Sequence, residues 1–277
     1  MSSRTRTIVF RTVPVIFIIV LLAIAMRYTA LIMFERKALP GKTTIDKEPA
    51  VPYQRLKIKS GDHQLDAFWV PAVNSSNAPA ILIFHGIGET IPLWVHVQEL
   101  LHDHQVSSLI FDYAGDGKSS GSASISTLNN DGLAAYDQLR RKVTSHTKIY
   151  FLGFSMGSGM AMQAAVKALP VPAGIILCEP WSSLQAAAAA TGTPKIFAYA
   201  LPDYWNNIEN ASRINCPILI IHSDSDRVFS LAMSQAIYQK ASVDRHIVIV
   251  HGFSHTGLYK KANMNYWSPV VNFVGGK

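Results

Sequence analysis

Residues 148–159 read KIYFLGFSMGSG, and this stretch decides the expected fold. An apolar run of strand length ends in Gly-x-Ser-x-Gly at residues 153–157 and continues into Ala-, Met- and Gln-rich sequence of helical character. A sharp turn between a strand and a helix is the context in which this motif lifts a serine hydroxyl clear of a sheet. In such a turn a Cβ at Gly153 or Gly157 would strike neighbouring backbone. The stretch therefore predicts a nucleophile at Ser155, and the flanking strand and helix argue against a chance match.

Length and composition indicate one folded domain with a membrane segment. The chain has 277 residues, enough for one α/β domain and an appendage. Hydrophobic residues make up 49% of it and charged residues 16%, against a usual charged share of about 25%. The net charge of +7 owes much to basic residues in or beside the N-terminal segment, namely Arg4, Arg6, Arg11, Arg27, Arg36, Lys37 and Lys42. No basic stripe interleaved with aromatic residues follows, so we expect no nucleic-acid partner.

The N-terminal segment is long enough to span a bilayer. Residues 12–26 are apolar and uncharged, and the apolar stretch continues across Arg27 to Phe34. As a helix its roughly 23 residues would be ~34 Å long. We expect a single-pass anchor within residues 1–37 and a catalytic domain on the non-cytoplasmic side, although basic residues on both flanks weaken this orientation. A cleaved signal peptide and a secreted enzyme are the alternative, since Ala23-Ile24-Ala25 forms an acceptable cleavage site.

The rest of the chain predicts an α/β fold, with a mostly parallel sheet of about eight strands covered by helices on both faces. We expect a linker at 38–50 and one domain at 51–277, which opens with a hairpin around Ser60-Gly61-Asp62. The later strands are expected at 78–84, 106–112, immediately before Ser155, and at 173–179, 217–222 and 246–250. The helices are expected near 91–104 and 125–143, after Ser155, and near 231–240 and 266–273.

An insertion at 181–215 is longer than an ordinary connection and rich in aromatic residues and proline. We interpret it as a lid, and a surface excursion that packs its own aromatic residues is the alternative. Cys178 and Cys216 would lie near the end of one strand and just before the start of its neighbour. That offset is on the order of 13 Å, too long for a disulfide.

A serine nucleophile needs a base within hydrogen-bond reach and a carboxylate that orients the base. Two later loops supply both, SDSDRV at 223–228 and HGFSHTG at 251–257, and each follows an expected strand. Because the carboxyl ends of parallel strands share one edge of a sheet, both loops should meet Ser155 there. The candidates are Asp224 and Asp226 for the carboxylate, and His251 and His255 for the base.

From about Tyr53 onward the chain resembles the α/β-hydrolase superfamily, and within it the serine hydrolases of the BEM46 and ABHD12/13-like group, which typically carry an N-terminal membrane segment. The matching motifs are IFHGIG, FDYAGDGKSSG, GFSMGSG, CPILIIHSDSDRV and GFSHTGLY. This resemblance implies Ser155 as the nucleophile, Asp226 as the acid and His255 as the base. Ser223 and Phe229 stand where the family usually has Gly and Pro, which keeps Asp224 open as an alternative acid.

Stabilisation of an oxyanion requires two backbone N–H donors. Met156, directly after the nucleophile, should give one, and Ile87 in the His-Gly-Ile-Gly loop after the third strand should give the other. Gly86 and Gly88 would let that loop bend towards the site. Together with Trp181, they are expected to contact the substrate.

The combined features predict a membrane-anchored serine hydrolase acting on carboxylic esters or thioesters, including lipid-derived acyl substrates. The alternatives are a peptidase or acyltransferase with the same triad, and a catalytically silent binding protein. The sequence implies no metal and no organic cofactor, and it leaves acyl chain length and oligomeric state open.

Overall fold

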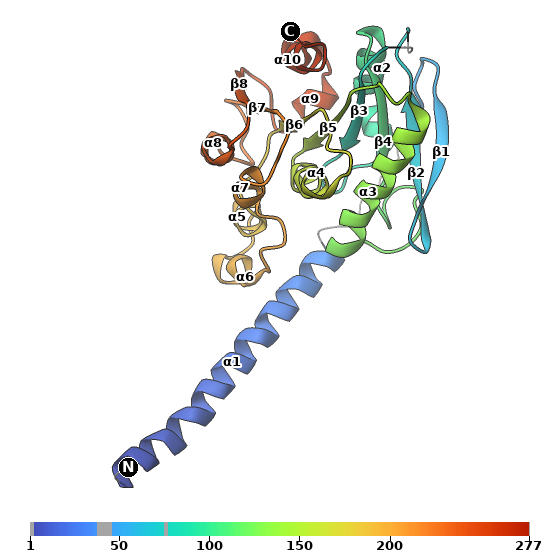
Figure 1. Ribbon diagram of the computed structural model, residues 1–277. Coiled ribbons are helices and arrows are strands. Elements are labelled where there is room, and N and C mark those ends of the chain that lie inside the picture. The colour runs from blue at the N-terminus through green and yellow to red at the C-terminus, as the bar shows by residue number, and fades with distance from the viewer. Residues whose placement is uncertain (1–2, 38–45, 75–76, 277) are drawn as a thin grey trace.

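One eight-stranded sheet organises the structure, a computed structural model that describes residues 3–37, 46–74 and 77–276 (Figure 1). The strand order is β1-β2-β4-β3-β5-β6-β7-β8. The pairs β1–β2 and β2–β4 are antiparallel, and all other neighbours are parallel. The strands are β1 Gln54–Ser60, β2 His63–Val70, β3 Ala80–Phe84, β4 Ser107–Phe111, β5 Ile149–Phe154, β6 Gly174–Cys178, β7 Ile218–Ser223 and β8 Arg245–Val250. The predicted fold class is confirmed.

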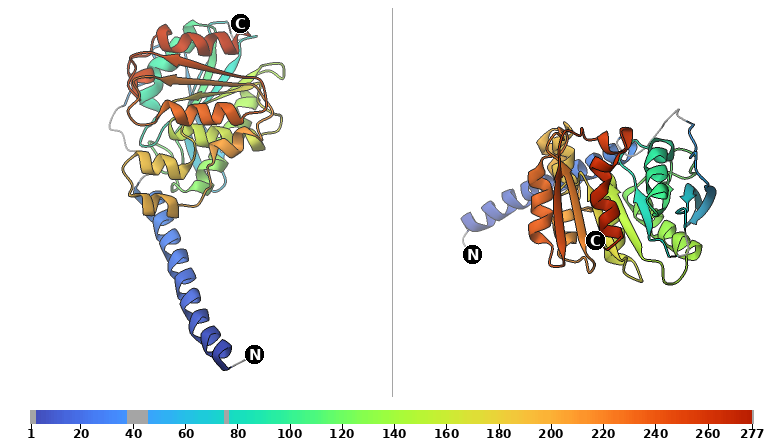
Figure 2. Two further views of the ribbon diagram at one scale, coloured as in Figure 1. Left: turned by 90° about the vertical axis from the view of Figure 1, so that its left-hand side faces the viewer. Right: turned by 90° about the horizontal axis from the view of Figure 1, so that it is seen from above.

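Helices cover both faces of this sheet (Figure 2). Strands β3 to β7 are buried at every position, which explains why their sequences are apolar runs without alternation. One face packs against α3, α4 and α8, and the other against α2, α9 and α10. The bounds are a 3-10 turn η1 at Ile91–Trp94, then α2 Val95–Asp103, α3 Ile125–Lys142, α4 Met156–Lys167, α8 Leu231–Lys240, α9 Gly257–Lys260 and α10 Met264–Val274. The short helix α9 was not predicted from the sequence.

The insertion at 181–215 folds into short helices at the edge of the sheet where Ser155 lies. They are α5 Leu184–Ala190, α6 Lys195–Ala200 and α7 Asn207–Ala211. A bridge between Ser183 and Asn206 closes the insertion at its base, and the Leu184 N–H donates to the carbonyl of Trp205 at 2.9 Å. Cys178 and Cys216 are both buried and free.

Helix α1, Ser3–Lys37, projects away from the domain and is joined to it at its C-terminal end (Figure 1). Among the described helices, α1 alone has a stretch long and apolar enough to cross a membrane, Val15–Arg36. Its last turns dock on the domain: the Phe34 ring packs edge-on against Trp205, and the Glu35 carboxylate accepts the N–H of Ile125 at the start of α3. Of the predicted linker at 38–50, residues 38–45 lie outside the described part of the chain.

The turn between β5 and α4 is tightly constrained. Ser155 adopts φ 51° and ψ −121°, a strained conformation for a residue with a side chain. Gly157 approaches the end of β3 so closely that a Cβ there would lie 2.0 Å from the carbonyl oxygen of Phe84. A Cβ on Gly153 would lie 2.6 Å from the carbonyl oxygen of Gly157. Backbone contact therefore accounts for both glycines of the motif.

The variant Gly157→Ala should lose about 3 kcal/mol or more of unfolding free energy, because backbone must move to admit the new Cβ. Denaturation of the full-length protein in detergent measures this loss. Gly61→Ala is the control: Gly61 also has positive φ, but a Cβ there meets nothing within 4 Å, so the cost should be about 1 to 2 kcal/mol. Equal losses in the two variants would contradict the packing argument.

Candidate active site

The structure brings Ser155, His255 and Asp226 together in one hydrogen-bonded chain. Ser155 Oγ lies 2.9 Å from His255 Nε2, and His255 Nδ1 lies 2.8 Å from Asp226 Oδ2. The three residues come from the ends of β5, β7 and β8, which reach the same edge of the sheet because these strands are parallel. This is the arrangement in which a serine can pass its proton to an oriented imidazole.

Asp226 is placed to remain ionised. Its side chain is fully buried, and Oδ1 accepts the N–H of Val228 at 2.7 Å and that of Phe229 at 3.3 Å. Burial alone would raise the pKa of Asp226, but the hydrogen bond and charge of His255, with the two N–H donors, lower it below its ordinary value. A carboxylate held in this way fixes the proton of His255 on Nδ1 and leaves Nε2 free to accept one.

Asp224 and His251, the alternative candidates for the acid and the base, form a separate pair. His251 Nδ1 lies 2.6 Å from Asp224 Oδ2, and both side chains are well exposed. The hydrogen bond from His251, followed by that from the Gly252 N–H, lowers the pKa of Asp224 to about 2. The geometry therefore groups Asp226 and His255 with Ser155, and it groups Asp224 with His251 at the surface.

The proposed oxyanion donors, Ile87 and Met156, line the same cavity as Ser155. Met156 opens α4, and Ile87 is followed by Gly88 at φ 70°, where the loop bends. Gly86 differs from the expectation, because it is buried under the loop and does not line the cavity. Its N–H donates to Glu89 Oε2 at 2.8 Å, and a Cβ there would press on Glu89 and Phe154. Gly86 thus shapes the loop and is not placed to contact a substrate.

Glu89 supports this loop and was missed in the sequence. Its Oε2 also accepts the indole N–H of Trp94 at 2.9 Å, and burial raises the pKa of its carboxyl group. The available signal was a single acidic residue before the apolar segment at 91–95. An ionisable residue beside a buried apolar segment is tolerated only where hydrogen bonds compensate the cost of its burial.

The cavity beside Ser155 has a volume of about 460 Å³ and mostly apolar walls. Trp181 is one of them, and it is only 1% exposed. Its indole N–H donates to the carbonyl oxygen of Ser155 at 2.8 Å, so Trp181 also steadies the nucleophile turn. Residues of α5 also line this cavity, so part of the insertion at 181–215 lies at the site.

Known proteins resemble this chain in sequence and in fold. The family model described as serine aminopeptidase, S33 (Hydrolase_4) matches residues 75–209. An esterase structure from Pyrococcus furiosus aligns with a TM-score of 0.71, 17% identity, and coverage of 86% of this chain and 97% of that one. The chain has the α/β-hydrolase fold. The structure of Est1E from Butyrivibrio proteoclasticus with ferulic acid bound also aligns with this α/β-hydrolase, with a TM-score of 0.63, 21% identity, and coverage of 80% and 96%.

Curated relatives of the α/β-hydrolase include a Mycobacterium tuberculosis protein described as uncharacterised, 26% identical over 193 residues, which are 69% of this chain and 68% of the relative. Lysophosphatidylserine lipase ABHD12 of Danio rerio is 27% identical over 228 residues, with coverage of 72% of this chain and 59% of the lipase. The chain thus spans less than two thirds of that lipase. Together the comparisons support the predicted ABHD12-like group and a serine hydrolase.

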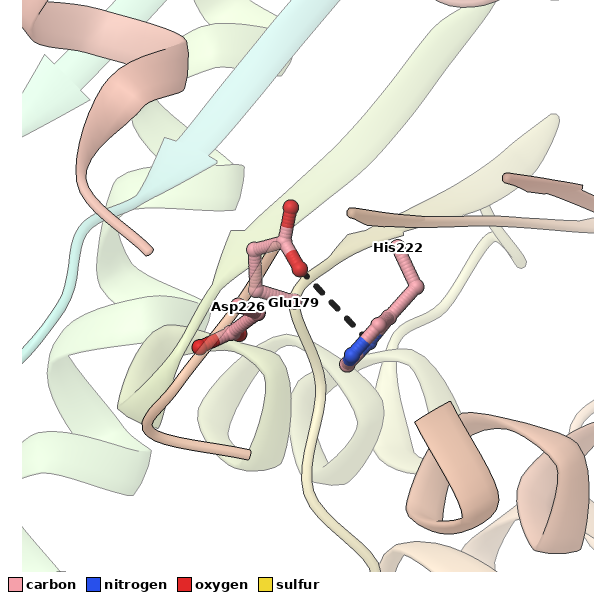
Figure 3. A group of neighbouring side chains, drawn as sticks. All are labelled: Glu179, His222 and Asp226. Atoms are coloured by element: carbon pink, nitrogen blue, oxygen red, sulfur yellow. Dashed lines mark ion pairs between the residues drawn. The ribbon is translucent and has the colours of Figure 1, made fainter. Parts of the chain in front are cut away.

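A second group of ionisable side chains lies beside Asp226 in the hydrolase: Glu179 and His222, with all three ligand-type atoms within 4.8 Å of one another (Figure 3). Glu179 follows β6, is fully buried and has φ 50°. Its carboxyl group accepts the Ser223 N–H at 3.0 Å and the Tyr266 hydroxyl at 3.1 Å. Burial raises the pKa of Glu179 to about 8, with the Asp226 charge acting in the same direction and the Ser223 N–H against it.

These residue types could ligate a metal, but their hydrogen bonds favour a supporting role. His222 Nδ1 lies 2.8 Å from Ser234 Oγ, and Nε2 lies 3.2 Å from the carbonyl oxygen of Phe229. Burial lowers the pKa of His222, so its ring is neutral at neutral pH. With Glu179 protonated as well, Asp226 carries the negative charge of this group. The sequence signal for both residues was a polar side chain at the end of an apolar strand.

The variant Glu179→Gln should remove a pH-dependent part of the stability. Because the folded-state pKa of Glu179 is raised from 4.5 to about 8, folded Glu179 keeps a proton that the unfolded chain releases in this range. The stabilisation that protonated Glu179 gives the folded state is fully present below pH 4.5. It is lost as the pH rises to about 8, at up to about 1.4 kcal/mol of unfolding free energy per pH unit. Denaturation between pH 5 and 8.5 should show a steeper decline for the natural protein than for Glu179→Gln.

Glu209→Gln on the surface of α7 is the matched control and should follow the natural protein. Parallel pH profiles for the natural protein and Glu179→Gln would show that Glu179 does not hold a proton in the folded state.

Proposed function

We propose that this α/β-hydrolase is a membrane-anchored serine hydrolase that cleaves carboxylic esters of lipid-like acyl substrates. The observation that carries the proposal is the hydrogen-bonded chain from Asp226 through His255 to Ser155, beside an apolar cavity. Each of these three residues has the hydrogen-bond partner that its chemical role requires.

The reaction follows from this geometry. Ser155 Oγ attacks the acyl carbonyl while His255 Nε2 takes the hydroxyl proton, and Asp226 stabilises the imidazolium that forms. The tetrahedral oxyanion faces the N–H groups of Met156 and Ile87, each worth about 10² to 10³ in rate. His255 then returns the proton to the departing alcohol, which leaves an acyl-enzyme on Ser155. Water attacks this ester by the same route, releases the acid and restores the serine.

The substrate class rests on the cavity and on the relatives. Apolar side chains such as Leu93, Leu184 and Phe229 line the cavity and suit an acyl chain. Several relatives are named lysophosphatidylserine lipases, which supports an amphiphilic ester as the substrate. A thioester would react through the same acyl-enzyme. The name of the matched family, serine aminopeptidase, makes peptide bonds the second candidate.

The proposed organisation is an anchor at 1–37, a linker at 38–50 and a hydrolase domain at 51–277 with a lid at 181–215. The docking of Phe34 and Glu35 on the domain supports an anchor that stays attached to it. We place the catalytic domain on the non-cytoplasmic side because basic residues precede the apolar segment. Secretion after cleavage at Ala25 is the competing outcome.

Ser155→Ala should lower kcat for a short ester by about 10⁴ to 10⁶ and leave the unfolding transition in place. It should also abolish labelling by a fluorophosphonate probe, which reacts with an activated serine. A panel of esters, thioesters and short peptides, tested on the natural protein, then identifies the bond. Near-normal ester turnover by Ser155→Ala would exclude the mechanism, and an unlabelled natural protein would favour a silent binding protein.

Asp226→Asn should lower kcat by about 10⁴, because the amide stabilises the wrong imidazole tautomer and carries no charge. Asp224→Asn is the matched control: it removes a carboxylate two residues away whose partner is the exposed His251, so kcat should change by no more than about twofold. Steady-state kinetics on one soluble ester compares them. A larger fall in kcat for Asp224→Asn than for Asp226→Asn would identify Asp224 as the catalytic acid.

A further inference from the structure

The lid helix α6 presents apolar side chains where α1 meets the domain. Ile196 is 65% exposed, Tyr199 is 62% exposed and Phe197 is 48% exposed. Helix α6 packs against α1, and the two lie side by side in both directions of view (Figures 1 and 2). An exposed cluster of this kind marks an interaction surface.

The position of α6 along the axis of α1 indicates that this apolar surface contacts a bilayer. The groove between the two helices is lined on the α1 side by Ala30, Met33 and Phe34, and the candidate span ends at Arg36. At 1.5 Å per residue, Ala30 lies ~9 Å from Arg36 along the helix axis. With Arg36 at the headgroups, α6 therefore lies within the 5–10 Å that apolar side chains of an interfacial helix reach into a bilayer. A bilayer crossed by α1 would therefore be continuous with this surface.

The groove between α1 and α6 leads towards the nucleophile. Its volume is about 370 Å³, and its lid side includes Phe197 and Leu201. Phe34, Thr191 and Thr193 line both this groove and the cavity that contains Ser155. The two hollows are therefore adjacent, with one end at the exposed face of α6 and the other at the reacting hydroxyl.

We propose that α6 lies in the interfacial layer of the bilayer, and that the acyl chain of a membrane lipid reaches Ser155 along the groove between α1 and α6. The lipid moves headgroup first into the cavity, which brings its ester carbonyl to Ser155 while the chain trails through the groove. The access route rests on the proposed ester hydrolysis, and the position of α6 rests only on the proposed anchoring through α1.

The position of α6 is tested with a fluorophore on full-length protein in phosphatidylcholine vesicles. Ile196→Cys is labelled with an environment-sensitive maleimide; the natural thiols are buried, and burial raises the pKa of Cys216 to about 11 and that of Cys178 further. Phosphatidylcholine carrying a nitroxide near the top of its chains should quench at least half of this fluorescence. Val73→Cys is the control, since Val73 is exposed after β2, at the opposite edge of the sheet.

The access route is tested with two 4-methylumbelliferyl esters that share a leaving group, a soluble butyrate and an oleate in phosphatidylcholine vesicles. Met33→Trp narrows the groove and should lower the ratio of kcat/KM for oleate to that for butyrate at least tenfold. Tyr28→Trp is the matched control, because Tyr28 is exposed on α1 outside the groove lining. It should leave the ratio unchanged.

Each outcome of these experiments tests one part of the proposal. Equal quenching at positions 196 and 73 would overturn the placement of α6. An unchanged ratio in Met33→Trp, or an equal fall in both α1 variants, would overturn the access route. Strong quenching at position 196, combined with no hydrolysis of either ester by the natural protein, would refute the proposed hydrolysis and leave α6 in the bilayer.

Discussion

The close approach of the β5–α4 turn to the end of β3 is the constraint on which the site depends. Gly157 lies against the carbonyl of Phe84, and the loop with Ile87 departs from the same strand end. The contact that sets the position of Ser155 therefore also sets the origin of that loop. The strained conformation of Ser155 is held by hydrogen bonds to its carbonyl oxygen, from the Trp181 indole at 2.8 Å and from the Ser158 hydroxyl at 2.6 Å. Strain is tolerated because the surrounding structure over-determines it.

Two carboxyl groups share the buried region beside His255, and their surroundings separate their properties. Asp226 faces the imidazole and two backbone N–H groups, which lower its pKa. Glu179 Oε2 lies 3.6 Å from His222 Nδ1 (Figure 3), but burial lowers the pKa of His222, so this ring supplies no positive charge, and burial raises the pKa of Glu179. One carboxyl group is thus ionised and the other neutral at pH 7, which avoids two adjacent buried negative charges. The neutral Glu179 carboxyl group and the neutral His222 ring together form a polar support beside Asp226 that needs no counter-charge.

The insertion at 181–215 and helix α1 meet beside the cavity that holds Ser155. Trp205 packs against Phe34, and its indole N–H donates to the Asn129 side chain on α3 at 2.8 Å. A side chain of α1 therefore lines the cavity that holds Ser155. Helix α1 contributes part of the cavity wall, so the position of α1 and the shape of the site are physically coupled.

The sequence by itself determined the nucleophile turn, because Gly-x-Ser-x-Gly between an apolar run and a helical segment is compatible with few other structures. It also determined the sheet, since buried parallel strands read as apolar runs. The residues alone left two candidates each for the acid and the base, and the family resemblance favoured Asp226 and His255. The tertiary structure brings these two to Ser155, because their positions depend on how the loops after β7 and β8 fold. Glu179 and Phe34 reached the site through long-range packing. Such contacts leave no local period in a sequence, and only the folded chain reveals them.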